Sequence, residues 1–289
     1  MTSAEPVNDS DAGEAAEHWK IQPAAPTIVG QLQSVWRYRK LFWPLAVRAL
    51  FEVYQGAVLG ITWMAVQPLV VAVSAAFVIG MVFGVSVDPV PLPLFILAGL
   101  AIWTLVRRVV QWTTRSMNSG AALLQRLYIP AFLLLLTSMS PAFFQFAVVL
   151  VLTAMTAIYY GWVASVGWQL FATIPAVLMG VTLGMALGCF MSILNAFARD
   201  TWLTLRYALS VWMVASPIFY PIEVIPVDYR WIIYLNPLTP IVELFRWGLL
   251  GYGTVQWHYL GIAAAQTVVL LLAGLWFFAR QQNRLFDHL

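Results

Sequence analysis

The chain has 289 residues with a formal net charge of +3 at pH 7, and 62% of its residues are hydrophobic while only 9% are charged. Soluble globular domains carry about 25% charged residues, so this composition excludes them and indicates an integral membrane protein. Several apolar stretches approach the roughly 20 residues that a helix needs to cross a bilayer, whereas a membrane β-barrel would show weak alternating segments. We therefore predict an all-α membrane protein.

The first 55 residues predict two different segments. Residues 1–30 combine acidic and small polar residues with little apolar surface, so we expect a disordered cytoplasmic tail there. Residues 31–55 mix basic with aromatic side chains, which suits an amphipathic helix in the lipid headgroup region. Its candidate interface residues are Arg37, Arg39, Trp43, Arg48 and Tyr54. An ordinary membrane anchor has the same composition, so the pattern leaves a functional role open.

Six membrane-spanning helices are predicted, at about residues 58–83, 94–112, 132–160, 169–197, 202–219 and 259–279. Pro68 predicts a kink in the first of them. Gly180, Gly184 and Gly188 recur every four residues in the fourth, a spacing that lets helices approach closely. Six crossings place both termini on one side of the membrane.

A polar loop of residues 113–130 joins the second and third predicted spans. Its centre, residues 120–128, has the pattern of a short amphipathic helix that ends at Pro130. We expect this loop on the same side of the membrane as the termini.

The segment after the fifth span is broken by prolines, and carboxylates appear within it. Its prolines are Pro217, Pro221, Pro226, Pro237 and Pro240. Proline interrupts helical hydrogen bonding, and open backbone at membrane depth persists only where protein buries it or where it lines a wet cavity. We predict short re-entrant helices on the outer side that gate or guide a substrate. Glu243 and Arg246, three residues apart, are expected to pair on one helix face.

The distribution of basic residues predicts the orientation. If both termini are cytoplasmic, only Arg230 and Arg246 of the 15 Lys and Arg residues fall outside, and 13 fall inside. This bias satisfies the positive-inside rule. Arg107 and Arg108 lie about 20 Å along the second span and can reach the inner surface. The basic pI of about 9.1 therefore reflects orientation and does not imply nucleic acid.

The sequence lacks the residue patterns of a nucleotide-hydrolysing or metal-dependent protein. It contains no phosphate-binding G-x-x-x-x-G-K-[ST] loop, and Lys20 and Lys40 are its only lysines. The three histidines are far apart in the sequence, so we expect neither a metal nor a cofactor. Proton-coupled transporters usually carry ionisable residues deep within several spans, and this sequence lacks that pattern. Energy for transport would then come from a partner protein.

Aromatic residues are abundant, with 14 Trp, 11 Tyr and 17 Phe. Many of them fit the usual enrichment of Trp and Tyr at membrane interfaces. Some could instead stack on sugar rings along a passage. The candidates for that second role, within spans or near their inner ends, are Trp63, Trp103, Trp112, Trp202 and Trp212. Periodicity does not decide between the two roles.

Four stretches together resemble a known family. They are RALFEVYQGAVLGITWMAVQPL from Arg48, LLQRLYIP from Leu123, FARDTWLTLRYALSVWMVASPIFYPIEVIP from Phe197, and LNPLTPIVELFRWGLLG from Leu235. In this order and separation they are similar to the type-2 ABC (ABC-2) exporter permeases that carry polysaccharides such as O-antigen, capsule and teichoic acid. The similarity covers nearly everything from about residue 31 onward.

The resemblance implies an architecture and partners. Residues 56–289 would form a six-span ABC-2 transmembrane domain, of the type V exporter fold, that assembles as a homodimer with two copies of a separate ATPase subunit. A coupling helix at about residues 118–128 would dock in that ATPase, with Asn118, Leu124, Gln125, Arg126 and Tyr128 as its contact residues. The amphipathic interface helix would frame a lateral entrance from the membrane lipid for an undecaprenyl- or other lipid-linked glycan.

The same resemblance implies outer gate helices at about residues 221–250 and a location in the bacterial inner membrane. The gate residues would be Phe219, Tyr220, Glu223, Tyr229, Trp231, Glu243 and Arg246. Other functions stay open: an exporter of another amphiphile such as a lipid or drug, an ATP-independent glycolipid flippase, or a membrane-embedded transferase. The glycan, its lipid anchor, and threading versus flipping are also left open.

Overall fold

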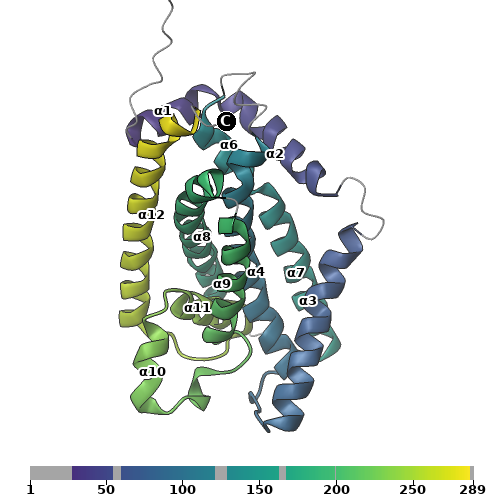
Figure 1. The fold of residues 1–289 in the computed structure, drawn as a ribbon. Coiled ribbons are helices and arrows are strands. Elements are labelled where there is room, and N and C mark those ends of the chain that lie inside the picture. Colours follow the sequence, from purple (N-terminus) through teal and green to yellow (C-terminus); the bar gives the residue numbers. More distant parts are fainter. Residues whose placement is uncertain (1–27, 55–59, 121–128, 163–166, 199, 287–289) are drawn as a thin grey trace, which may run out of the picture.

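The computed structural model describes residues 28–54, 60–120, 129–162, 167–198 and 200–286. These residues form helices and connecting turns, with no β-strand among them. Figure 1 shows long helices running between two ends of a bundle. We call the end that carries the N-terminal helices and the C-terminus the α1–α2 end, and the opposite end the α10 end. The predicted all-α membrane architecture is confirmed.

The segment for which an interface helix is predicted forms two helices, α1 (Ile28–Arg37) and α2 (Arg39–Tyr54), that lie across the α1–α2 end (Figure 1). A turn at Tyr38 separates them, so the prediction of one continuous helix is wrong in this detail. Leu41 donates its backbone N–H to the carbonyl of Tyr38 at 2.9 Å, and this hydrogen bond lies at the start of the second helix. Pro44 weakens the start of α2 because it has no N–H to donate.

Five helical segments are long and apolar enough to cross a membrane in the described part of the chain. They are Thr62–Val82, made of α3 (Gly60–Phe77) and the π-helical turn η1 (Val78–Val82); α4 (Leu92–Ser119); Ala131–Tyr159, made of α6 (Ala131–Thr137) and α7 (Ser140–Tyr159); Trp168–Phe197, made of η2 (Trp168–Ala172) and α8 (Thr173–Phe197); and Trp257–Gln282, within α12 (Trp257–Phe286). Five of the six predicted spans therefore correspond to membrane-length helices.

The remaining predicted span, at about residues 202–219, is shorter than expected. It appears as α9 (Asp200–Ala215), whose 16 residues extend about 24 Å at 1.5 Å per residue. A residue before proline is disfavoured in the helical conformation, and Ser216 precedes Pro217, which explains why α9 ends at Ala215. A count of six full crossings is thus not confirmed.

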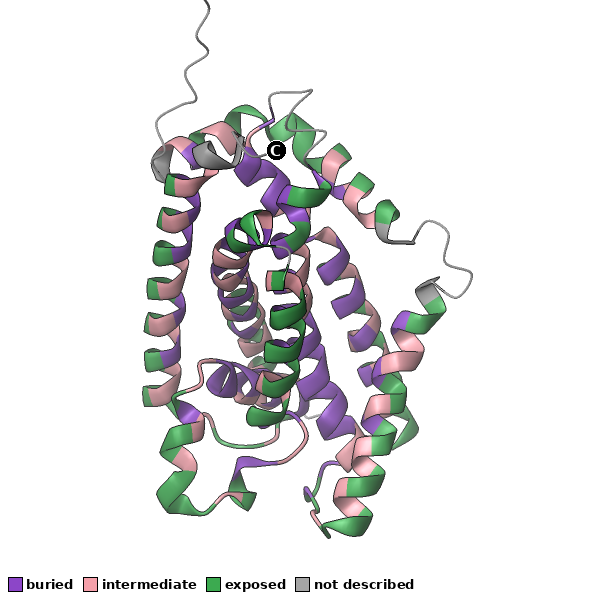
Figure 2. Cartoon of the chain, in the orientation of Figure 1, coloured by how far each residue is buried: buried purple, intermediate pink, exposed green. Residues whose placement is uncertain are grey.

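Helix α4 forms the core of the bundle and packs against α8, α7, α3 and α11. Figure 2 shows it largely buried, whereas α3 is mostly exposed or intermediate. The glycines of α8 face α4, as their spacing predicts. A Cβ atom on Gly184 would lie 2.9 Å from Cβ of Val109, closer than side chains tolerate. Glycine at this position therefore allows the close approach of α8 to α4.

The proline-rich segment at the α10 end forms short helices, as predicted. These are η3 (Ile222–Val224), α10 (Val227–Tyr234) and α11 (Leu238–Leu250). Pro221, Pro226 and Pro237 directly precede them, where a missing N–H costs no hydrogen bond. Helix α11 packs against α8 and α4 and leads through residues 251–256 to α12. The chain therefore turns back before reaching the α1–α2 end (Figure 1).

Candidate functional site

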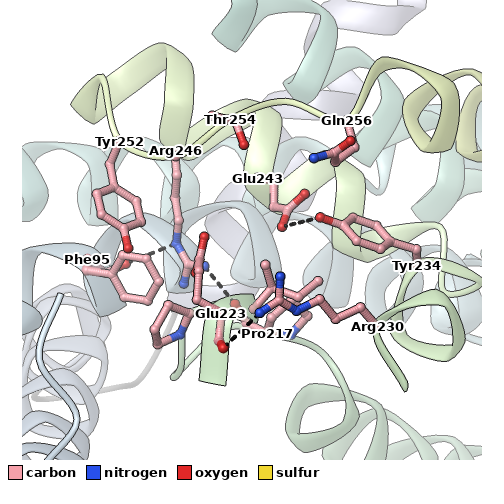
Figure 3. Close-up of a pocket in the computed structure, with 13 residues that line it drawn as sticks. Phe95, Pro217, Glu223, Arg230, Tyr234, Glu243, Arg246, Tyr252, Thr254 and Gln256 are labelled. Carbon is pink, nitrogen blue, oxygen red and sulfur yellow. Dashed lines mark hydrogen bonds between the residues drawn. The ribbon is translucent and has the colours of Figure 1, made fainter. Parts of the chain in front are cut away.

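Arg246 of α11 is the most connected charged residue at the α10 end, and only 3% of its surface is exposed. Its Nη1 donates to the carbonyl of Pro217 at 2.7 Å and its Nη2 to the carbonyl of Ile218 at 2.6 Å. Its Nε donates to the carbonyl of Phe95 at 3.3 Å, and the guanidinium carbon lies 3.6 Å from the centre of the Phe95 ring (Figure 3). One cation thus ties α11 to α4 and to the chain that follows α9.

The local sequence explains why Arg246 can occupy this position. The carbonyls of Pro217 and Ile218 lie beyond the last turn of α9, where helical partners run out. Gly99 of α4 leaves the space that the guanidinium fills, because a Cβ atom at that position would overlap Arg246 Nη2 and lie 2.9 Å from the Ile218 oxygen. The position of Arg246 therefore depends on the absence of a side chain at Gly99, 147 residues earlier in the sequence.

The expected pairing of Glu243 with Arg246 is wrong. Both residues are described, and no nitrogen of Arg246 lies within 4.0 Å of the Glu243 carboxylate. Glu243 instead accepts a hydrogen bond of 3.1 Å from the hydroxyl of Tyr234 in α10 (Figure 3). Residues three apart on a helix can pair, but the free backbone carbonyls offer the guanidinium closer partners. The two charged side chains therefore tie α11 to different elements.

A polar cavity of about 90 Å³ lies beside these side chains. Its charged and hydroxyl-bearing lining residues are Glu223, Arg230, Tyr234, Glu243, Arg246, Tyr252 and Thr254 (Figure 3). This volume is about that of three water molecules and far below the 300 to 1,000 Å³ of typical ligand pockets. Arg230 donates to the carbonyls of Ile225 at 2.8 Å and Glu223 at 3.0 Å, which holds η3 against α10. In this conformation the cavity is a polar joint, too small for a sugar ring.

Asn236 is a residue that sequence reasoning missed. Its Oδ1 accepts the indole N–H of Trp212 at 2.9 Å and the backbone N–H of Leu238 at 3.1 Å, while its Nδ2 donates to Ser216 Oγ at 2.8 Å. It therefore fastens the end of α9 to the start of α11. An asparagine just before a helix start is a capping signal, which could have identified it.

The five candidate passage aromatics occupy different environments. Trp103, a candidate for lining a passage, is 1% exposed in the core of the bundle and does not face a passage in this conformation. Trp212 uses its indole N–H on Asn236 and contacts Trp103 edge-on at 5.7 Å. Trp63 is 58% exposed on α3. Trp112 and Trp202 line a cavity of about 690 Å³ towards the α1–α2 end.

Of the other predicted gate residues, Glu223 lines the polar cavity with Glu243 and Arg246, while the rest lie elsewhere at the α10 end. Tyr229 and Trp231 of α10 are exposed, at 61% and 54%. Phe219 and Tyr220 are partly buried in the turn after α9, and Glu223 is exposed in η3. Their role in a gate stays a prediction.

The predicted interface residues lie on the surface of the α1–α2 end. Arg37 and Arg39 are exposed, and Trp43 is 73% exposed. Arg48 pairs with Glu52 at 2.6 Å across one helical turn. The side chain of Tyr54 lies outside the described residues.

Of the predicted coupling residues, Asn118 lies in the last turn of α4 and donates to the carbonyl of Asn195 at 3.3 Å. Leu124, Gln125, Arg126 and Tyr128 lie outside the described residues. The predicted coupling helix is therefore described only at its first residues.

The membrane-length helices and the broken segment at one end define a helical, multi-pass membrane protein. The sequence pattern of the ABC-2 type transporter family matches residues 40–250, most of the chain. The chain therefore belongs to the ABC-2 type transporter family, as its sequence motifs predict, and is a membrane component of a transporter.

Curated relatives are similar over almost their whole length. An O-antigen export system permease protein RfbA of Klebsiella pneumoniae is 24% identical over 232 residues, which cover 80% of this chain and 88% of the relative. A second protein of that name and organism is 25% identical over 236 residues, with the same coverage. An RfbA permease of Myxococcus xanthus is 23% identical over 257 residues, covering 86% of this chain and 94% of the relative.

Proposed function

We propose that this chain is the membrane subunit of an ATP-driven exporter that carries a lipid-linked polysaccharide, such as O-antigen or capsule, across the bacterial inner membrane. The observation that carries the proposal is the match to O-antigen export permeases over 88% to 94% of their length. The family match over residues 40–250 includes the broken segment at the α10 end.

The α1–α2 end would face the cytoplasm. Under this orientation 13 of the 15 basic residues lie inside, as the positive-inside rule requires. The exposed basic and aromatic residues of α1 and α2 would then rest at the cytoplasmic surface of the inner membrane, where anionic lipids attract cations. The polar joint around Arg246 would lie on the periplasmic side and hold the gate helices α10 and α11 in the conformation seen here.

The power source would be a separate ATPase subunit, because this sequence contains no phosphate-binding loop. Residues 118–128 would transmit its motion. Asn118 and Asn195 support this role, since their side chains cross-link the ends of α4 and α8: Asn118 donates to the Asn195 carbonyl and Asn195 to the Thr114 carbonyl, each at 3.3 Å. A push on the loop would then reach two core helices together. Two copies of this chain would form the passage.

A gene-deletion experiment tests the proposal. Cells that lack this chain should lose surface polysaccharide and accumulate lipid-linked glycan in the inner membrane, and the wild-type gene should restore export. A variant with Arg126 replaced by Glu should remain in the membrane but fail to restore export. Normal surface glycan in the deletion strain, or accumulation of a different lipid or drug, would favour the alternative of an exporter for another amphiphile.

A further inference from the structure

The cavity of about 690 Å³ towards the α1–α2 end has the size of a ligand site. It lies between α2, α4, α7, α8 and α9. Its lining residues include Glu52, Trp112, Arg115, Asn118, Asn195 and Trp202. A cation, two indoles and two amides thus surround one space. The family match assigns no ligand to it, and the sequence offers only Trp112 and Trp202 as candidates for stacking on sugar rings.

Arg115 is the cation of this cavity, and its charge is not neutralised by an acid. Its guanidinium carbon lies 4.1 Å from the centre of the Trp202 ring. Among the described residues, no carboxylate oxygen lies within 4.0 Å of a nitrogen of Arg115. The one acid in the lining, Glu52, is held by Arg48 at 2.6 Å. Arg115 is therefore held in position by an aromatic ring while its donors stay available to an anion.

The same face of α4 continues from the cavity along the helix. Most of α4 is buried, yet residues 108, 111, 112, 115, 118 and 119 in its C-terminal half are exposed or partly so. Spacings of three and four place these positions on one face. Arg108 is on this face and donates to Gln111 at 3.5 Å, about 10 Å along the axis from Arg115. A positively charged and aromatic strip thus leads from the cavity into the membrane region.

The two indoles have separate tasks in this geometry. One face of Trp202 is covered by Arg115, so Trp202 positions the cation. Trp112 also lines the cavity, is partly exposed, and offers a flat apolar surface of the kind on which sugar rings pack. Asn118 and Asn195 also line the cavity, and their side-chain oxygens can accept hydrogen bonds from sugar hydroxyls.

We propose that this cavity binds a glycosyl phosphate group, with Arg115 contacting the phosphate and Trp112 the adjacent sugar. The inference rests on the proposed function, because the group would be the sugar-phosphate junction of the lipid-linked glycan before export. A water-soluble nucleotide sugar carries the same chemistry. The two sources differ in whether a lipid chain is attached, and the binding test separates them.

Binding of defined probes to the purified full-length chain in phosphatidylcholine nanodiscs tests this site. The probes are polyprenyl diphosphate bearing one N-acetylglucosamine, the same lipid without sugar, a neutral polyprenyl glucoside, UDP-N-acetylglucosamine, and phosphatidylglycerol. Wild type should bind the first probe most tightly. Arg115→Gln should weaken that binding about tenfold, the effect of losing a charge-assisted hydrogen bond, without changing binding of the neutral glucoside. Trp112→Leu should remove the preference for the sugar-bearing lipid over the sugar-free one.

The chain offers a matched control for Arg115. Arg280 also lies over a tryptophan, Trp276, at 5.4 Å, but on the exposed surface of α12 and away from the cavity lining. Arg280→Gln should leave the affinity for all five probes unchanged. Arg115→Lys, which keeps the charge, should retain part of the affinity and guards against a folding defect in Arg115→Gln.

Several results would overturn the proposed site, and they differ from failure of the proposed function. Equal weakening by Arg115→Gln and Arg280→Gln would show general attraction of anions. Phosphatidylglycerol bound as tightly as the glycosyl lipid would indicate an ordinary phospholipid site, and tighter binding of UDP-N-acetylglucosamine would exclude the lipid-linked source. If wild type exports glycan but Arg115→Gln binds and exports normally, the site is wrong while the function stands. If wild type binds none of the glycosyl probes, the function falls as well.

Discussion

Replacing Gly99 with alanine tests the polar joint at the α10 end. On helix propensity alone, alanine within α4 should stabilise the protein by about 1 kcal/mol relative to glycine. The structure predicts the opposite sign. The added methyl group would overlap Arg246 Nη2, lie 3.1 Å from Arg246 Cζ and lie 2.9 Å from the Ile218 oxygen, so the guanidinium must move away from its carbonyl partners.

The size of the effect follows from the steric overlap and from the hydrogen bond that the displaced guanidinium would give up. Overpacking costs about 1 to 3 kcal/mol, and loss of one hydrogen bond from a charged donor costs about 1.5 to 3 kcal/mol. After the gain in helix propensity is subtracted, Gly99→Ala should lower the free energy of unfolding by about 1.5 to 5 kcal/mol. Amide hydrogen exchange should also accelerate in the residues that follow Pro217 and Ile218, because Arg246 binds the carbonyls of these two residues.

Gly261 of α12 supplies the control, because a Cβ atom there would meet nothing within 4 Å. Both variants and the wild type would be unfolded thermally in one detergent, with hydrogen exchange measured in parallel. Gly261→Ala should match or exceed the stability of wild type while Gly99→Ala falls below it. Equal stability of the two alanine variants would refute the steric argument and the central position of Arg246.

Three further predictions concern other contacts. Asn236→Ala should destabilise the protein by about 1 to 3 kcal/mol, because the Trp212 indole N–H and the buried Ser216 hydroxyl each lose a hydrogen-bond partner, and unchanged thermal unfolding would contradict the network. Gly188→Val should prevent close packing of α8 on α4 at Thr113 and lower both the yield of folded protein and its melting temperature; full wild-type stability would contradict that packing. Arg48→Ala should change stability by less than about 1 kcal/mol, since its ion pair with Glu52 is half exposed, and a larger loss would show a structural role.

The membrane-length helices were predictable because burial in lipid demands long apolar runs that composition displays directly. Their ends were less accessible. Apolar residues continue past Ala215 and predict a fifth span that reaches Phe219, whereas Pro217 ends the helix earlier. The division of the interface helix at Tyr38 has no glycine or proline at the turn itself, so no local signal marks it.

The candidate site was only partly predictable, since its contacts join distant segments. The sequence singles out Arg246, but its neighbour Glu243 is the only partner that the residue pattern displays. Its partners are backbone carbonyls 28, 29 and 151 residues away. Every residue carries a backbone carbonyl, so the identity of a residue does not reveal which carbonyls bind Arg246. In the same way, apolar periodicity cannot say which face of a fully apolar helix turns inwards. For that reason the sequence does not distinguish Trp103, buried in the core, from Trp112, which lines a cavity.

The central claim is that this chain is a passage driven by a separate ATPase. The most direct measurement is glycan movement into inside-out membrane vesicles that contain this chain and its ATP-binding partner, with radiolabelled lipid-linked glycan on the outside. We predict uptake that requires ATP and stops when either the partner or its hydrolytic activity is removed. Equal uptake without ATP, or by this chain alone, would contradict the account and indicate a flippase.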